Sequence, residues 1–172
     1  MDSKPQAVFI GVSGAGKTQI AHAVAQLLNQ PVHESATYVG EVAGQDAELT
    51  VVRSDPKAYA AHTIAGALKA LTQSGVVVLS PDAPLEKEVA EKLKALRADG
   101  VKVIELYADF NTLANRTGLN APRSVSLGPT RRTFRLLVEA YREAYSSLAD
   151  EKIDTSLTKP EFVAPRVVAL LG

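Results

Sequence analysis

Eight consecutive residues near the start of the chain match the pattern G-x-x-x-x-G-K-[ST]. They read Gly-Val-Ser-Gly-Ala-Gly-Lys-Thr at positions 11–18 and follow the apolar run 7–10. The run predicts a buried strand, and an apolar stripe behind the loop predicts a helix, with Ile20, Val24, Leu27 and Leu28 on one side. A glycine-rich loop between a strand and a helix binds phosphate, because its backbone N–H groups and the helix amino terminus converge on an anion. The motif therefore predicts nucleotide binding.

Each residue type in this loop has a predicted role. Glycine allows backbone conformations that a side chain would forbid. Lys17 is expected to reach the terminal phosphates and to act in catalysis, and the Thr18 hydroxyl to take one position on an octahedral Mg²⁺. The predicted cofactors are ATP and Mg²⁺, with the nucleotide bound by Gly11, Ser13, Gly14, Ala15, Gly16, Lys17 and Thr18.

Composition narrows the class of protein further. The 172 residues suit one domain covering 1–172, and the chain contains no cysteine for disulfides or thiolate chemistry. The three histidines have no zinc-ligand spacing. The 19 basic and 19 acidic residues balance, which argues against a nucleic-acid or anionic-membrane partner and favours a small-molecule substrate. With neither a secretory signal nor a membrane span in evidence, a cytoplasmic protein is expected. Composition does not predict the oligomeric state.

Apolar runs and helical stripes alternate along the chain. Further strands are predicted at 76–79, 101–107 and 152–155. Helices are predicted at 56–73, from Pro84 to Gly100, up to Arg116, at 131–149 and from Pro160. Alternating strands and helices predict an α/β fold, a three-layer α/β/α sandwich with a central parallel sheet. Residues 31–55 are weakly patterned, and 50–52 form either an extra strand or, as we favour, the approach to the second helix.

Helix boundaries and buried faces follow from the same patterns. Asp55 or Ser54 is expected to cap the second helix, and Asp109 or Asn111 a short later one. The expected inner faces are Tyr59, Ile64, Leu68 and Leu71 in the second helix, Leu85, Val89, Leu93 and Leu96 in the third, and Phe134, Leu137, Val138, Tyr141, Tyr145 and Leu148 in the long helix. The polar, proline- and glycine-containing segment at about 117–130 is expected to be mobile.

The chain resembles the shikimate kinase family in its phosphate-loop motif, in the length of its single domain and in the polar segment at about 117–130. The sequence Arg-Thr-Gly-Leu-Asn-Ala-Pro-Arg at 116–123 is similar to that family's lid. The resemblance implies that Arg116 packs on the adenine and that Arg123 acts in catalysis at the transferring phosphates. It also implies a P-loop kinase fold and transfer of the γ-phosphoryl group of ATP to shikimate or a related anionic hydroxy acid.

A second segment, Arg-Glu-Ala-Tyr-Ser-Ser-Leu-Ala-Asp at 142–150, is similar to the family's R-x-x-[LA]-Y-x-x-x-A segment. The resemblance implies that Arg142 binds the substrate carboxylate, for which a planar guanidinium is suited. A solvated basic helix face shared with Arg131 and Arg135 is the alternative for Arg142. For Arg123 the alternative is an ordinary solvated charge.

Three departures from the family pattern fall on the phosphoryl-acceptor side. Glu34-Ser35-Ala36 stands where the family has a D-x-D pair. Glu34 keeps a carboxylate for Mg²⁺ or substrate, but Ala36 cannot accept a proton. Ala60 stands where a substrate-binding arginine is expected. Ser-Pro-Asp at 80–82 replaces a triple-glycine turn, which removes one N–H and adds a negative charge.

Two other side chains are candidates to replace the groups missing from the acceptor side. Asp82 can rebuild a metal or hydroxyl contact, although we favour a role as the cap of the helix near Pro84. His33 has a suitable pKa for a base, although a structural or exposed histidine is the favoured interpretation.

The leading hypothesis is thus an ATP-dependent kinase of a small hydroxylated metabolite. A gluconate-type sugar-acid kinase is an alternative, because the loop sequence also resembles that family. A nucleotide-binding protein without turnover, favoured by Ala36 and Ala60, is another. A purely structural protein would require that the loop has no nucleotide affinity.

Overall fold

The computed structural model describes residues 3–43, 55–118 and 128–172. Its strands form one five-stranded parallel sheet in the order β2-β3-β1-β4-β5. The strands are β1 (Pro5–Ile10), β2 (Val32–Glu34), β3 (Gly75–Val78), β4 (Lys102–Tyr107) and β5 (Glu151–Asp154). The helices are α1 (Lys17–Leu28), α2 (Ser35–Ala43), α4 (Pro56–Ala70), the 3₁₀ turn η1 (Ala83–Leu85), α5 (Lys87–Ala98), α6 (Phe110–Arg116), α7 (Gly128–Tyr145) and α8 (Pro160–Leu170).

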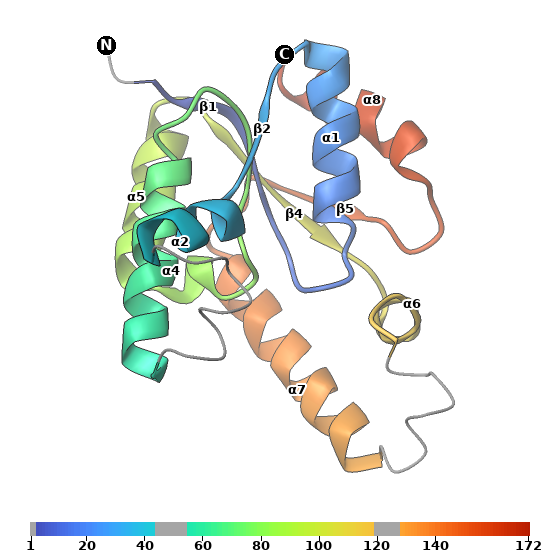
Figure 1. Cartoon of the computed structure of the whole chain (residues 1–172). Coiled ribbons are helices and arrows are strands. Elements are labelled where there is room, and N and C mark those ends of the chain that lie inside the picture. The colour runs from blue at the N-terminus through green and yellow to red at the C-terminus, as the bar shows by residue number, and fades with distance from the viewer. Residues whose placement is uncertain (1–2, 44–54, 119–127) are drawn as a thin grey trace.

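Helices cover both faces of the sheet. Helices α1 and α8 pack together on one side, and α2, α4 and α5 lie on the other (Figure 1). Helix α7 runs past the edge at which the parallel strands end. This arrangement confirms the predicted three-layer α/β/α sandwich with a central parallel sheet.

The middle of the sheet forms the core. All four residues of β3 are buried, and this strand pairs in parallel with β1 on one side and β2 on the other. Five of the six residues of β1 are also buried. These continuous apolar runs are typical of parallel strands covered on both faces, and they were predictable for that reason.

The weakly patterned region beyond Pro31 contains two elements that the sequence did not predict, β2 and α2. Strand β2 is only three residues long and half-buried. Helix α2 packs closely on α4 at Gly66, where an added Cβ atom would lie 2.7 Å from Val39 Cγ2 and 2.8 Å from the Val39 backbone nitrogen. This close contact depends on tertiary packing rather than on a local pattern. Residues 50–52 lie outside the described residues.

Two of the predicted caps are confirmed. Asp55 Oδ1 accepts a hydrogen bond of 2.7 Å from the Ala58 N–H at the start of α4. Asp109 Oδ1 accepts one of 2.8 Å from the Thr112 N–H at the start of α6. Each side chain satisfies an N–H group that the first turn of a helix leaves unpaired.

The predicted helix from Pro84 is interrupted. Ala83–Leu85 form the 3₁₀ turn η1, and α5 begins only at Lys87, because Glu86 adopts an extended conformation with ψ 133°. Asp82 precedes η1, but its side chain makes no capping hydrogen bond. The capping role that the sequence favoured for Asp82 is therefore wrong.

Several predicted inward-facing leucines are exposed instead. Leu27 is 57% exposed, Leu85 43% and Leu137 45%. Leu137 belongs to α7, a helix that extends beyond the sheet (Figure 1). In α4 the fully buried positions are the small residues Thr63, Gly66, Ala67 and Ala70. At Gly66 the close approach of α2 leaves no room for a larger side chain, and the predicted inner-face residues Tyr59, Ile64 and Leu68 are only half-buried.

Candidate active site

The glycine-rich loop turns sharply between β1 and α1. Gly14 and Gly16 have φ of 88° and 93°, in the left-handed region that side chains disfavour. A Cβ atom at Gly11 would lie 2.4 Å from the Leu106 carbonyl oxygen of neighbouring β4. Glycine is therefore required at all three positions. The loop presents its backbone at the amino end of α1, as an anion-binding site requires.

Lys17 folds back over this loop. Its Nζ donates hydrogen bonds to the carbonyl oxygens of Gly11, at 2.7 Å, and Val12, at 3.1 Å. Burial lowers the Lys17 pKa from 10.5 to about 8, although the Glu34 carboxylate acts in the opposite direction. Lys17 forms no salt bridge with a described residue, and an incoming anion would favour the charged form of its ammonium group.

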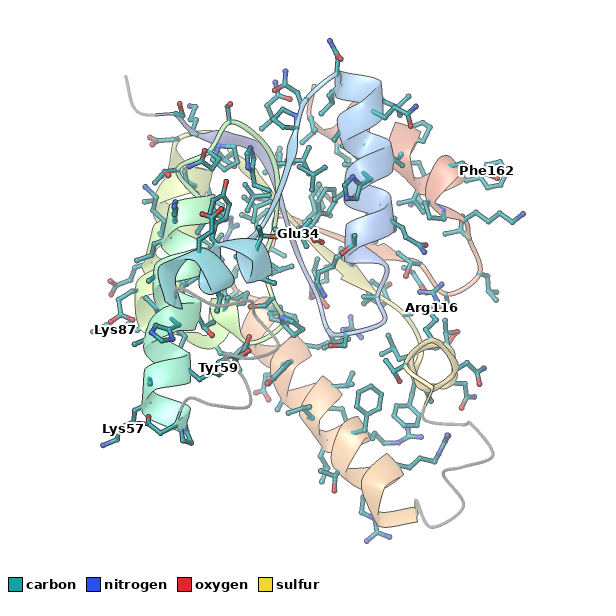
Figure 2. The ribbon with its side chains drawn as sticks, in the orientation of Figure 1. Glu34, Lys57, Tyr59, Lys87, Arg116 and Phe162 are labelled. Atoms are coloured by element: carbon teal, nitrogen blue, oxygen red, sulfur yellow. The ribbon has the colours of Figure 1, made fainter. Side chains whose placement is uncertain are left out.

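Thr18 and Glu34, the two predicted Mg²⁺ ligands, lie in direct contact. Thr18 Oγ1 donates a hydrogen bond of 2.5 Å to Glu34 Oε1. Glu34 ends β2 at the start of α2, between the P-loop and α4 (Figure 2). A hydroxyl and a carboxylate are the hard oxygen ligands that Mg²⁺ prefers, and both side chains lie at the surface of the site. The donor set therefore fits Mg²⁺.

Arg116 projects from α6 toward the P-loop (Figure 2). Its Nη1 donates to the Gly14 carbonyl oxygen and to Thr155 Oγ1, both at 3.1 Å, and its Nη2 donates to the Thr155 carbonyl oxygen at 2.6 Å. The predicted adenine-side arginine thus connects α6, the P-loop and the segment after β5.

Thr155 is a site residue that the sequence analysis missed. It is buried, and its hydroxyl lies 2.7 Å from the Ala15 carbonyl oxygen of the P-loop and 3.1 Å from that of Tyr107. The signal available in the sequence was position: Thr155 directly follows a parallel strand, and ligands bind beyond the carboxyl ends of such strands.

A cavity of about 440 Å³ adjoins these groups. Its lining comprises Gly14, Gly16, Lys17, Thr18, Gln19, Ile20, Arg116, Thr155, Thr158 and Pro160. The cavity therefore joins the amino end of α1 to the base of α6 and the β5–α8 connection. Most predicted nucleotide-binding residues are brought together here, whereas Arg123 lies outside the described residues.

The side of the site toward α4 is built differently. Ser35 is buried, and its Oγ accepts a hydrogen bond of 2.9 Å from the Ser80 N–H, so it joins the ends of β2 and β3. Tyr59 points from α4 toward the centre of the molecule (Figure 2). Burial raises the pKa of the Tyr141 hydroxyl on α7, and the nearby Asp82 and Tyr59 raise it further. Tyrosines and a carboxylate therefore face one another across this region.

Arg142 turns toward β4. Its Nε donates a hydrogen bond of 2.9 Å to Glu105 Oε2, and its guanidinium lies 4.2 Å from the centre of the Tyr107 ring. Tyr145 lies three positions after Arg142, whereas the pattern R-x-x-[LA]-Y places the tyrosine four positions after the arginine. Counted from Tyr145, the arginine position of the pattern falls on Tyr141. Glu105 was not singled out in the sequence, because one acidic residue in an apolar strand carries no motif.

Two further contacts concern residues that the sequence singled out. Tyr145 donates a hydrogen bond to the Pro81 carbonyl oxygen, which joins α7 to the Ser80-Pro81-Asp82 turn. His33 Nδ1 lies 2.9 Å from the Tyr38 hydroxyl and stacks near that ring. Because successive side chains of a strand point to opposite faces, His33 is directed away from the face on which Glu34 meets Thr18.

Comparison with known proteins identifies relatives along nearly the whole chain. A family model described as shikimate kinase matches residues 13–171. The shikimate kinase of Thermobifida fusca is 31% identical over 167 residues, which cover 95% of this chain and 93% of that protein. Among the described residues, no helix is long and apolar enough to cross a membrane.

Solved structures share the fold. A shikimate kinase from Acinetobacter baumannii in complex with shikimate has a TM-score of 0.80 at 17% identity, covering 98% of this chain and 93% of that one. A gluconokinase from Sinorhizobium meliloti has a TM-score of 0.60 at 18% identity, covering 99% of this chain and 93% of that one. The first structure matches this fold more closely than the second.

Proposed function

The chain belongs to the shikimate kinase family, and we propose that it transfers the γ-phosphoryl group of ATP to shikimate or a related small hydroxy acid. The observation that carries this proposal is the contact between Thr18 and Glu34, at 2.5 Å. It brings a phosphate-loop hydroxyl and a carboxylate from β2 together, at the junction of the nucleotide cavity and the region beside α4.

The P-loop and its neighbours supply the groups that bind ATP and Mg²⁺. Lys17 supplies positive charge to the β- and γ-phosphates, and the backbone N–H groups of residues 11–16 surround them. Thr18 and Glu34 would hold Mg²⁺, which neutralises phosphate charge and orients the phosphates when bound. Arg116 lines the nucleotide cavity, and we assign it to the adenine. We assign Arg123, which lies outside the described residues, to the transferring phosphates.

The acceptor half requires groups that bind a hydroxylated molecule. The attacking hydroxyl forms a bond to the γ-phosphorus as the bond to the β–γ bridging oxygen breaks, and its proton passes to a base. Ala36 cannot be that base. We assign the role to Asp82, whose carboxylate has no capping bond and lies near Tyr141. Arg142 is assigned to the acceptor's carboxylate.

The alternatives account for less. The gluconokinase structure resembles this fold less closely than the shikimate kinase structure does, and the family model is that of shikimate kinase. A nucleotide-binding protein without turnover is favoured by one observation, the absence of a side-chain base and of an arginine at Ala36 and Ala60. Because the proposed reaction consumes ATP, we place it in the cytoplasm.

Calorimetric titration tests the proposal. ATP with Mg²⁺ is titrated into the protein alone and with shikimate present, and Lys17→Ala is the control variant. We expect ATP affinity that the variant loses and that shikimate changes. ATP binding unaffected by shikimate would favour the protein without turnover, and equal ATP binding by both proteins would contradict a functional P-loop.

A further inference from the structure

Glu105 is a buried carboxylate that the proposed phosphoryl transfer does not use directly. It lies in β4 opposite Ile10, the last residue before the P-loop. Its side chain is 1% exposed, and Oε1 makes no hydrogen bond to the part of the chain that the structure describes. A buried carboxylate requires a compensating charge, because burial without one is costly. Arg142 supplies that charge.

Arg142 is held on two sides. Its Nε binds Glu105 Oε2 at 2.9 Å, and its flat face lies 4.2 Å from the Tyr107 ring centre. Nη1 and Nη2 donate no hydrogen bond to a described residue, and the side chain is 36% exposed. The guanidinium thus has a fixed orientation with two of its nitrogens available to an acceptor molecule.

The charge of this guanidinium is already balanced by Glu105. Three features of the acceptor side also disfavour a negatively charged acceptor. Ala60 provides no second guanidinium, Asp82 adds a carboxylate near Tyr141, and Tyr141 rather than arginine occupies the pattern's position four residues before Tyr145. Arg142 retains directional N–H groups for any oxygen, but its net attraction for a carboxylate is reduced.

We propose that Glu105 determines acceptor selectivity by cancelling the charge of Arg142, so that an uncharged hydroxylated acceptor competes with one bearing a carboxylate. This inference rests on the proposed kinase function. It concerns the substrate class: the enzyme distinguishes weakly between a hydroxy acid and a neutral polyol-like molecule that presents the same hydroxyl groups.

The experiment compares shikimate with its methyl ester, which has the same ring hydroxyls and no carboxylate charge. The ratio of kcat/KM for the two acceptors is measured by coupled ADP release at saturating ATP and Mg²⁺. The test variant is Glu105→Gln, which removes the negative charge of the carboxylate. Its amide oxygen can still accept the hydrogen bond from Arg142 Nε. We expect the ratio to rise in favour of shikimate by about three- to tenfold, through a lower KM for shikimate. This is the size of effect expected when one nearby negative charge is removed from a site that solvent partly screens.

A double variant, Glu105→Gln with Arg142→Gln, removes both charges and avoids an unpaired buried carboxylate. We expect it to lose the gain in selectivity. Glu143→Gln is the matched control, because Glu143 is the next residue on α7 and is exposed. Solvent screens its charge, so the ratio should stay at the wild-type value.

The outcomes separate the inference from the proposed function. Turnover of both acceptors with an unchanged ratio in Glu105→Gln would overturn the inference alone, and so would an equal rise in the control Glu143→Gln. Wild-type protein that binds ATP and Mg²⁺ but phosphorylates neither acceptor would overturn the proposed function, and the inference with it. A rise confined to Glu105→Gln and lost in the double variant would support both.

Discussion

Thr18 Oγ1 donates a hydrogen bond of 2.5 Å to Glu34 Oε1, which joins the first turn of α1 to the end of β2. These residues are 16 positions apart in the sequence, and only the parallel arrangement of β1, β3 and β2 brings them together. In the proposed enzyme this contact marks the metal position between nucleotide and acceptor. It therefore gives the first prediction.

Glu34→Gln should weaken Mg²⁺ dependence. The substitution removes a charged oxygen ligand while keeping the length of the side chain, so we expect the Mg²⁺ concentration for half-maximal activity to rise by roughly 10-fold or more. Activity is measured over a Mg²⁺ series at fixed ATP. Glu41→Gln, a substitution in an exposed residue of α2 that pairs with Lys69, should behave as wild type. An unchanged Mg²⁺ requirement in Glu34→Gln would contradict a metal role for this carboxylate.

Nucleotide binding should take up a proton near Lys17. Burial lowers the Lys17 pKa to about 8, and bound phosphates favour the charged ammonium, which raises that pKa in the complex. Above pH 8 the free protein must therefore gain a proton as it binds ATP, and ATP affinity should fall as pH rises. Calorimetry at pH 8.5 in buffers of different ionisation enthalpy measures this uptake. The uptake should be absent in Lys17→Met; proton release, or uptake that persists in the variant, would rule out this assignment.

Thr155→Val should lower the stability of the protein and weaken ATP binding in the nucleotide cavity. The hydroxyl is within hydrogen-bond distance of the Ala15 and Tyr107 carbonyl oxygens and accepts from Arg116, so valine removes these polar contacts. We expect a loss of about 1–3 kcal/mol in the free energy of unfolding, together with weaker ATP binding. Urea unfolding and ATP titration measure the two effects. Thr155→Ser keeps the hydroxyl and should retain most of both; equal losses in the two variants would point to the methyl group instead.

Asp82→Asn should impair turnover more than binding. If Asp82 accepts the proton of the attacking hydroxyl, kcat should fall by about 10²- to 10⁴-fold with little change in the KM for ATP. Asp99→Asn, at the exposed end of α5, is the control. A kcat near the wild-type value would show that phosphoryl transfer here proceeds without this base, through positioning and charge alone.

Local patterns predicted much of the fold. The P-loop, the buried runs of β1 and β3, and the caps Asp55 and Asp109 are encoded within a few neighbouring residues, and the structure confirms them. Strand β2 escaped prediction because three half-buried residues carry no periodicity. The exposure of Leu137 also depends on tertiary structure, since a helical stripe does not show that α7 extends beyond the sheet.

The site residues also fall into two groups, those that a local motif identifies and those that depend on partners distant in the sequence. Contiguous motif residues such as Lys17 and Thr18 could be identified from the sequence alone, and their roles toward phosphate and Mg²⁺ stay predictions. Glu105 and Thr155 could not, because each acts through partners that are distant in sequence: Arg142 is 37 residues from Glu105, and Ala15 is 140 residues from Thr155. Asp82 was misassigned as a cap because aspartate before a proline-containing turn is a common capping pattern, whereas its backbone here is already helical.

The most direct measurement is ADP release by the wild-type protein with ATP, Mg²⁺ and shikimate, with Lys17→Ala assayed in parallel. The proposed function predicts saturable, shikimate-dependent ADP release accompanied by an equal amount of phosphorylated shikimate, and a rate in Lys17→Ala reduced by orders of magnitude. ATP binding without any shikimate-dependent ADP release or phosphorylated product would contradict it.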